Sequence, residues 1–367
     1  MTTAVVLFTR DLRYHDNPAL AAAHREADRV VPLFVRDPHF HASQRRLAFL
    51  ERLLAELPGL RIAEGDVVEE VARWRPDAVY CSDDASAYAQ RRESRLSERF
   101  DVRLYPGTTV VGLGDLKTYR VFTPYFRVWS EEPRRAIEEP PVEAPETDAR
   151  RALDAWLRDD RQTGSRLSPY LHFGALSPLE CAVRAQHKPE FVRQLCWRDF
   201  YLQLLRAAPE SFRLGGRVSQ DAGFEAWRAG CTGYPLVDAG MRQLAAEGWL
   251  PNRVRMVVAS FLVYDLELDW RAGARHFEEL LLDADVASNR GNWLWVIKNR
   301  HRIFNPERQA RDFADYIERW VTIDDGYPPP IVDHAEVMAR RRGLPVGRAP
   351  GTLIDSSVNT SSSHRER

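Results

Sequence analysis

Hydrophobic residues follow two patterns along the first third of the chain. Five short apolar runs rich in β-branched residues are typical of strands. They lie at 4–8, 29–35, 60–65, 77–83 and 102–107. Four segments between them carry apolar residues at three- and four-residue spacing with charges in between, which is the amphipathic helical pattern. They lie at 19–27, 47–57, 67–74 and 87–100. Strands that alternate with helices predict an α/β domain with a doubly wound parallel sheet.

The pattern changes after this region. Residues 129–160 are rich in Glu, Pro and Arg and show helical periodicity only at their end, so they predict a linker. Helical periodicity then dominates 161–335, which predicts an all-α C-terminal domain. We therefore expect an α/β domain at 1–128, the linker, the helical domain, and a C-terminal tail at 336–367. The end of this tail is low in apolar residues, and we expect it to be disordered.

Charge neither supports nor excludes a nucleic-acid partner. The 52 Lys and Arg side chains nearly cancel the 53 Asp and Glu side chains, so a nucleic acid would have to bind to a local basic patch. The stretch 290–311 is a candidate, because it contains a single acid, Glu307. Its basic residues are Arg290, Lys298, Arg300, His301, Arg302, Arg308 and Arg311.

Cysteine spacing and hydropathy narrow the class of protein further. The four cysteines are scattered without CxxC spacing, so we expect no bound metal, no disulfide framework and a cytoplasmic location. The longest apolar run, 256–264, falls far short of the ~20 residues that span a bilayer. We therefore expect no membrane insertion.

Chemistry-bearing residues gather in four stretches of the predicted helical domain. They are "SRLSPYLHFGALSP" (165–178), "WRDFYLQLL" (197–205), "NRVRMVVASFLVYDLELDW" (252–270) and "DADVASNRGNWLWV" (283–296). The two hydroxyls and the guanidinium of "SRLS" suit phosphate oxygens, although Ser165 and Ser168 could equally cap a helix. Arg255 lies in an apolar segment, where a buried guanidinium needs a carboxylate partner. Taken alone, Asn289 is typical of a turn, and the neighbouring tryptophans are typical of core packing.

These four stretches occur in the same order as in a known family. Together with "LFTRDLRYHDNPAL" near the N-terminus, they resemble the photolyase and cryptochrome family, most closely its class I cyclobutane pyrimidine dimer photolyases, over roughly residues 1–335. The resemblance implies that the helical domain binds FAD. The implied cofactor-contacting residues are Ser165, Arg166, Leu167, Ser168, Arg198, Arg255, Asp283, Asp285 and Asn289.

The resemblance also implies individual roles within the site. Asp283 is the implied partner of Arg255, Asp285 lies at the polar edge of the flavin, and the Asn289 amide faces flavin N5. Trp293 and Trp270 match the two inner members of the family's photoreduction chain.

A second set of matches concerns the substrate. Trp197 and Trp295 match the aromatic walls of the pocket for a dimer flipped out of DNA, and Met256 matches its apolar floor. Asn252 and Arg253 complete the implied substrate set. With Gln194, the residues Asn289, Trp293 and Trp270 form the expected catalytic set.

The chain departs from the family pattern at several places. Gln194 stands where dimer photolyases carry a glutamate, and an amide cannot supply an acidic proton. No tryptophan occurs between Trp197 and Trp227, where the family places the outermost relay member. The loop after Trp295 is short, the linker lacks the stretch with an expected FAD-contacting tyrosine, and an Asn-Glu pair typical of folate antenna binding is not visible.

These matches and departures lead to one expected function and two alternatives. We expect FAD-dependent, blue-light-driven repair of pyrimidine dimers in DNA by a monomer that binds damaged DNA. One alternative is a cryptochrome-like blue-light photoreceptor. The other is a flavin photoenzyme or redox enzyme that acts on a small molecule. The sequence leaves the antenna pigment open.

Overall fold

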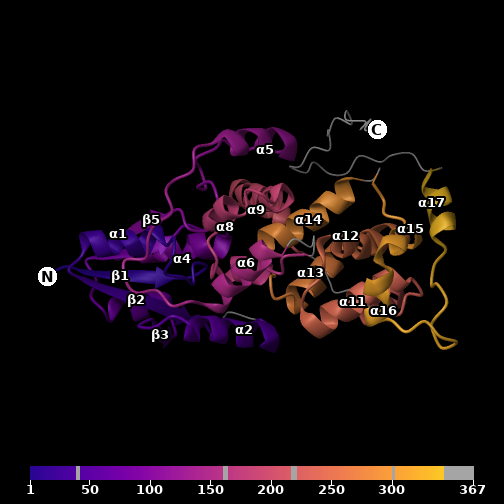
Figure 1. The fold of residues 1–367 in the computed structure, drawn as a ribbon, viewed down its shortest axis with the longest axis horizontal. Helices are drawn as coiled ribbons and strands as arrows, with labels where there is room; N and C mark the ends of the chain where they lie inside the picture. The colour runs from indigo at the N-terminus through magenta and orange to yellow at the C-terminus, as the bar shows by residue number, and fades with distance from the viewer. Residues whose placement is uncertain (39–41, 160–163, 216–220, 300–301, 343–367) are drawn as a thin grey trace.

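A five-stranded parallel sheet forms the N-terminal end of the molecule (Figure 1). The computed structural model describes residues 1–38, 42–159, 164–215, 221–299 and 302–342. The strands run in the order β3-β2-β1-β4-β5, with β1 paired to β2 from Thr3↔Arg29 and to β4 from Ala4↔Ala78. They are β1 (Thr3–Phe8), β2 (Arg29–Arg36), β3 (Arg61–Glu64), β4 (Ala78–Ser82) and β5 (Asp101–Tyr105). The predicted doubly wound sheet is confirmed.

Helices cover both faces of this sheet because the side chains of a strand alternate between its faces. Val5 and Leu7 point to a small cluster with Val68 and Leu96 from α3 and α4. Ala4, Val6 and Phe8 point the other way, into a core that is continuous with that of the helical domain. The helices of this domain are α1 (Pro18–Glu26), α2 (Gln44–Ala55), α3 (Val67–Ala72) and α4 (Ala87–Ser97).

The rest of the described chain is helical, as the periodicity predicts. Two helices connect the domains, α5 (Phe122–Glu131) and α6 (Asp148–Arg158). The helical domain contains α7 (Ser168–Phe173), α8 (Pro178–Arg184), α9 (Pro189–Ala207), α10 (Ala222–Ala229), α11 (Pro235–Glu247), α12 (Asn252–Ser260), α13 (Trp270–Leu280), α14 (Val286–Lys298), α15 (Pro306–Ala310), α16 (Ala314–Trp320) and α17 (His334–Arg342). A π-helical turn at Phe261–Asp265 follows α12.

Two helices lie where the sequence indicates a boundary or a tail. Helix α5 crosses the expected domain boundary at residue 128, because Phe122, Tyr125 and Trp129 form one buried face. Helix α17 extends into the expected tail, where Val337 is buried and Arg341 donates to the Tyr264 carbonyl at 3.0 Å. Tertiary contacts stabilise both segments. The end of the tail lies outside the described residues.

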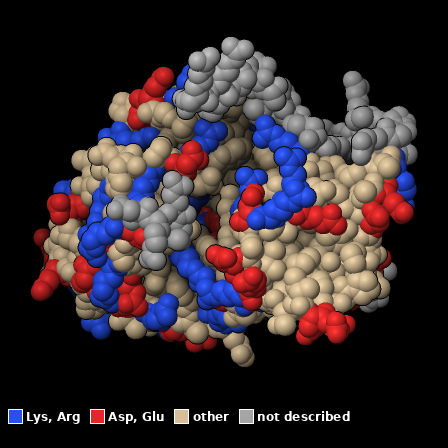
Figure 2. Space-filling model, turned by 45° about the vertical axis from the view of Figure 1, so that its right-hand side comes forward, with Lys and Arg blue, Asp and Glu red and all other residues tan. Residues whose placement is uncertain are grey.

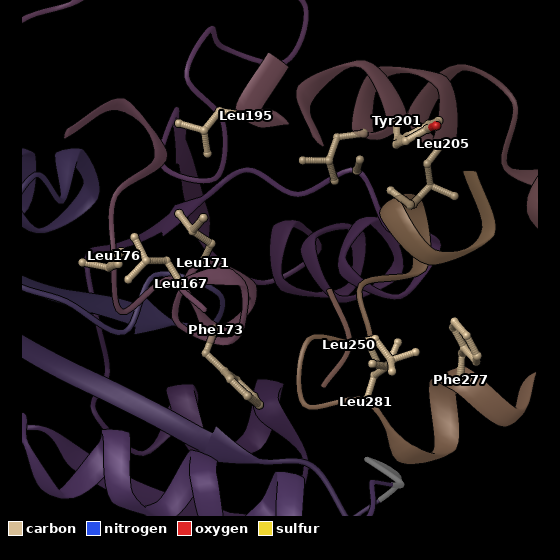
Figure 3. Packing of buried hydrophobic residues seen from close by; sticks show 14 of the residues in the cluster. Leu167, Leu171, Phe173, Leu176, Leu195, Tyr201, Leu205, Leu250, Phe277 and Leu281 are labelled. Atoms are coloured by element: carbon tan, nitrogen blue, oxygen red, sulfur yellow. The ribbon is translucent and has the colours of Figure 1, made fainter. Parts of the chain in front are cut away.

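Apolar side chains from several helices meet in the helical domain (Figure 3). The labelled residues come from α7, α9, α13 and the segments beside them. Some of these core residues also line a large cavity, namely Leu171, Leu195, Tyr201, Leu250 and Phe277. The core thus forms part of the cavity wall.

The two domains touch where α7 meets the end of β1. Gly174 follows α7 with φ of 69°, and a Cβ at this position would overlap the Arg10 carbonyl. The Leu12 amide donates to the Phe173 carbonyl at 3.2 Å. A glycine is required here, both by the left-handed backbone and by the close approach of the second chain segment.

Candidate cofactor and substrate site

One cavity of about 810 Å³ in the helical domain brings together most of the predicted site residues. Its volume lies in the range of ligand pockets. The predicted residues that line it are Ser165, Arg166, Ser168, Gln194, Trp197, Arg198, Asn252, Arg255, Met256, Asp283, Asp285, Asn289 and Trp293. Leu167, Arg253, Trp270 and Trp295 are not among the lining residues.

Helical periodicity explains which residues of α12 and α14 reach the cavity. On α12 the lining residues are Asn252, Arg255, Met256 and Ala259, spaced three, four and seven residues from the first. On α14 they are Ser288, Asn289, Asn292, Trp293 and Val296. Each set lies on one side of its helix, because residues three or four apart share a face.

The same geometry separates the two tryptophans of α14. Trp293 and Trp295 lie two residues, about 200°, apart around the helix. Trp293 is buried and lines the cavity, whereas Trp295 is half-buried and packs against the core elsewhere. The sequence placed both rings at the site, and the structure brings only Trp293 to the cavity wall.

Arg255 has the carboxylate partner that its apolar surroundings demand. Its guanidinium donates to both oxygens of Asp283, at 3.1 and 2.9 Å, and to the Leu250 carbonyl at 3.0 Å. The predicted pair is confirmed. The pair fixes a charged, planar hydrogen-bonding group on the cavity wall.

Asp285 combines a helix-capping role with an ion pair across the domains. Its Oδ1 accepts from the Ser288 amide at 2.6 Å at the start of α14, and its Oδ2 binds Arg10 of the α/β domain. Burial alone would raise the pKa of Asp285, but the guanidinium groups of Arg10 and Arg198 hold this pKa well below its usual range. The carboxylate is therefore ionised at the cavity wall.

Asn289 does not make the local bonds of a turn asparagine. Its amide nitrogen donates to the Ala274 carbonyl at 2.9 Å and to Glu278 Oε1 at 3.2 Å, both on α13. Glu278 is itself paired with Arg290 at 2.6 Å. Because the amide hydrogens bind protein acceptors, the side chain offers its carbonyl oxygen to a ligand, as a hydrogen-bond acceptor.

The "SRLS" segment has a strained backbone beside the cavity. Arg166 has φ of 53°, a left-handed conformation that is uncommon for residues other than glycine. Its guanidinium lies 4.5 Å from the ring centre of Trp249 and pairs with Glu247 at 2.9 Å. The Ser165 hydroxyl accepts from the Leu167 amide at 3.3 Å. Strain of this kind persists at ligand sites where the surroundings hold it in place.

The other members of "SRLS" differ in access to the cavity. Ser168 is the first residue of α7, which has no side-chain cap bond, so the alternative of a simple helix cap at Ser168 is wrong. Leu167 is 0% exposed and supports the segment from within the core. Ser168 is thus available to a ligand, whereas the Leu167 side chain packs in the core.

Arg198 and His172 form the polar wall between Asp285 and the α/β domain. Arg198 donates to the carbonyl oxygens of Thr108 and Leu171. Burial, followed by the charge of Arg10, lowers the pKa of His172 to about 3, so its imidazole is neutral at pH 7. His172 lies within the "SRLSPYLHFGALSP" motif, but the sequence does not show that Arg10 lies beside it and helps to keep its imidazole neutral.

Further aromatic rings surround Trp293 beside those of the predicted relay. Phe277 and Trp227 pack on Trp293, with ring centres 5.3 and 6.4 Å away. Trp270, 7% exposed, begins α13, and Gly273 one turn later packs directly on the Trp293 indole. Trp227 is a neighbour that the sequence did not indicate, because its contact depends on the packing of α10.

The basic stretch 290–311 is partly neutralised. Arg290 binds Glu278 and donates to the Phe212 carbonyl at 2.7 Å, so it is a structural ion pair and not a free phosphate contact. Arg302, Arg308 and Arg311 are exposed. Arg300 and His301 lie outside the described residues. Arg253 is also exposed, with its guanidinium 5.5 Å from the ring centre of Phe304.

Fold and cavity together define a class of protein. The cavity has charged and amide groups from Asp283, Asp285 and Asn289 near the Trp293 ring, and hydroxyls at Ser165 and Ser168. An aromatic wall beside fixed polar groups suits a flavin, and hydroxyls on a strained loop suit a diphosphate. The donor set therefore fits FAD, and the molecule is a two-domain flavoprotein.

Comparisons with known proteins identify the family. Residues 4–146 match the family described as DNA photolyase, and residues 191–323 match the FAD-binding domain of DNA photolyase. The chain is 38% identical to a deoxyribodipyrimidine photo-lyase from Streptomyces griseus, over 94% of this chain and 100% of that protein. The chain therefore belongs to the DNA photolyase family and binds FAD.

Solved structures agree with this assignment. A photolyase from Sulfolobus tokodaii, whose crystal structure contains two FAD molecules, superposes with a TM-score of 0.83 at 29% identity, over 94% of this chain and 100% of that chain. A cryptochrome from Synechocystis superposes with a TM-score of 0.78 at 24% identity, over 93% and 99% of the two chains, which shows a shared fold. Within the described ranges, no helix is long and apolar enough to cross a bilayer.

Proposed function

We propose that this protein is a deoxyribodipyrimidine photo-lyase that uses blue light to split pyrimidine dimers in DNA. The observation that carries the proposal is that residues of both predicted sets line one cavity. The polar cofactor set is represented by Arg255, Asp285 and Asn289. The substrate set is represented by Trp197, together with Asn252 and Met256 of α12, and Gln194 of the expected catalytic set lines the same cavity. A bound cofactor and a base inserted beside it would share this space.

The residues of this chain would bind and orient both partners. FAD supplies the light-driven electron that opens the cyclobutane ring and is then returned. Arg255, Asp283 and Asp285 would hold the cofactor through its polar groups, and the Asn289 carbonyl oxygen would accept a hydrogen bond from it. Trp197 offers a stacking surface worth about 1–3 kcal/mol per base, which offsets the cost of unstacking the dimer from DNA.

Damaged DNA is the proposed partner, and its phosphates would be bound by local basic residues. Lys and Arg side chains gather on the left half of the face in Figure 2 and around its recessed centre, while a broad area on the right is largely uncharged. The formal net charge of −1 cannot itself attract DNA. We further propose that the protein acts in the cytoplasm, where DNA is accessible. It would act as a monomer, because binding to DNA does not require an oligomeric partner.

Photoreduction of oxidised FAD would begin at Trp293, with Trp270 next in the relay. The absence of a tryptophan between residues 197 and 227 predicts slow photoreduction by external donors. We expect Trp293→Phe to abolish most of it, measured as the change in flavin absorbance under blue light. Rapid photoreduction that is equal in wild type and Trp293→Phe would contradict the proposed relay.

A repair assay tests the proposed function. The FAD-loaded protein is reduced, mixed with an oligonucleotide carrying one defined cyclobutane dimer, and illuminated with blue light. We expect restored pyrimidines in the light and none in the dark or in protein without FAD. No repair by protein that contains reduced FAD would overturn the proposal and favour a photoreceptor or a small-molecule enzyme.

A further inference from the structure

The indole of Trp197 is covered on the side away from the cavity. Phe122 of α5 stacks on it with ring centres 3.5 Å apart and planes 4° from parallel. Phe122 is buried, whereas Trp197 is half-buried and lines the cavity. Only one face of the indole is therefore available to a planar ligand.

Other aromatic rings fix the edges of this stack. Phe200 meets Phe122 and Trp197 edge-on, at interplanar angles of 84° and 87°. Tyr201 lies 5.4 Å from Trp197. With one face and its edges in contact with other rings, the indole has little freedom to tilt.

A positively charged side chain lies over the ring of Phe122. The guanidinium of Arg193, on α9, lies 5.2 Å from the ring centre of Phe122 and 4.9 Å from that of Phe126. A cation over an aromatic face is attractive, so Arg193 holds Phe122 against Trp197. The stack thus runs from Arg193 through Phe122 to Trp197 and ends at the cavity.

We propose that Phe122 is a positioning residue, which holds the Trp197 indole in the plane that receives a pyrimidine dimer flipped out of DNA. This inference rests on the proposed function. It adds that a wall of the substrate site is supported by α5, a helix of the connection between the domains that packs on α9 (Figure 1). Without the Phe122 ring, the indole could rotate away and stack on a base less often.

The expected effect is moderate and selective. An indole that is no longer held in plane stacks less well on the flipped base, so loss of the Phe122 ring should weaken dimer binding by about fivefold, which corresponds to about 1 kcal/mol. Binding to undamaged DNA depends on phosphate contacts and should not change. A purely structural role would weaken binding to damaged and undamaged DNA alike.

Three variants of the FAD-loaded protein test this. Phe122→Leu removes the ring at a similar volume, and Phe122→Tyr keeps the aromatic face. Phe100→Leu is the control, because Phe100 packs in the α/β domain, outside this stack. The dissociation constant is measured in the dark for one oligonucleotide with and without a cyclobutane dimer, together with bound FAD and repair at saturating DNA. We expect Phe122→Leu to lose about fivefold in the ratio of the two constants, with repair at saturation retained. Phe122→Tyr and Phe100→Leu should match wild type.

The outcomes separate the inference from the proposed function. A wild-type protein that does not distinguish damaged from undamaged DNA refutes the proposed function itself. If wild type does distinguish them, an unchanged ratio in Phe122→Leu, or an equal loss in Phe100→Leu, overturns the role of Phe122. If Phe122→Leu does not retain FAD, Phe122→Met takes its place, and its ratio of dissociation constants is compared with wild type and with the control variant in the same way.

Discussion

At the residue scale, Gln194 is the side chain with the most direct bearing on repair. It is exposed, lines the cavity, and lies one turn before Trp197 on α9. We expect Gln194→Glu to raise the repair yield per absorbed photon several-fold, because a carboxylic acid donates a stronger hydrogen bond as charge develops on the dimer. A several-fold gain corresponds to only about 1 kcal/mol.

The comparison needs equal flavin content and equal illumination. Gln194→Ala is the control, since it removes the amide without adding an acid, and we expect it to repair less than wild type. A lower yield in Gln194→Glu than in Gln194→Ala would show that Gln194 does not face the substrate in the expected way.

His172 predicts how stability depends on pH. Its pKa is about 3 in the folded protein, lowered by burial and then by Arg10, against about 6.5 in an unfolded chain. Below about pH 6.5 the unfolded chain binds a proton that the folded protein excludes, so the free energy of unfolding falls as pH falls towards 3. The loss is at most about 1.4 kcal/mol per pH unit.

Substitution of this histidine should flatten the pH profile. We expect the midpoint of urea unfolding to change less between pH 7 and pH 5 in His172→Gln than in wild type. His187→Gln, at an exposed position, is the control and should keep the wild-type slope. Equal slopes in wild type and His172→Gln would refute the assignment.

At the element scale, close helix packing positions the Trp293 ring. A Cβ at Gly273 of α13 would overlap Trp293 and Leu262. We expect Gly273→Ala to lower the free energy of unfolding by about 1–3 kcal/mol, because overpacking outweighs the gain of about 1 kcal/mol in helix propensity. Denaturant titration measures this loss.

Gly215→Ala provides a control, because no atom of the described residues lies within 4 Å of a Cβ built there. We expect it to leave stability nearly unchanged. If Gly273→Ala proves as stable as Gly215→Ala, the contact between α13 and the indole is looser than the structure indicates.

At the scale of the whole molecule, charge is distributed unevenly although the total nearly cancels. We expect the logarithm of the DNA-binding constant to fall linearly with the logarithm of the salt concentration, because each neutralised phosphate releases counterions. Arg302→Glu should weaken DNA binding and reduce the slope of this salt dependence by an amount that corresponds to about one or two phosphate contacts. Arg61→Glu, on edge strand β3, is the control, and fluorescence anisotropy at several salt concentrations measures both. Binding that is independent of salt would argue against a phosphate-contacting surface.

The elements of the α/β domain follow from the sequence alone. The strands at 4–8 and 77–83 and the helix at 19–27 are visible as local patterns, because side-chain periodicity reports which face of an element is buried. The ordered motifs likewise led to the family and to FAD. A carboxylate partner for Arg255 was expected because a buried guanidinium requires one, and the family resemblance implied Asp283.

Tertiary structure alone decided which side chains meet. Arg10 and Asp285 are 275 residues apart and form an ion pair only because β1 ends against α7 and the start of α14. Trp293 reaches the cavity and Trp295 does not, since the direction of each ring depends on how α14 is rotated against α9 and α12. Phe122 stacks on Trp197 because α5 packs on α9. Local periodicity records burial but not the partner, and the partner is set by packing between segments far apart in the sequence.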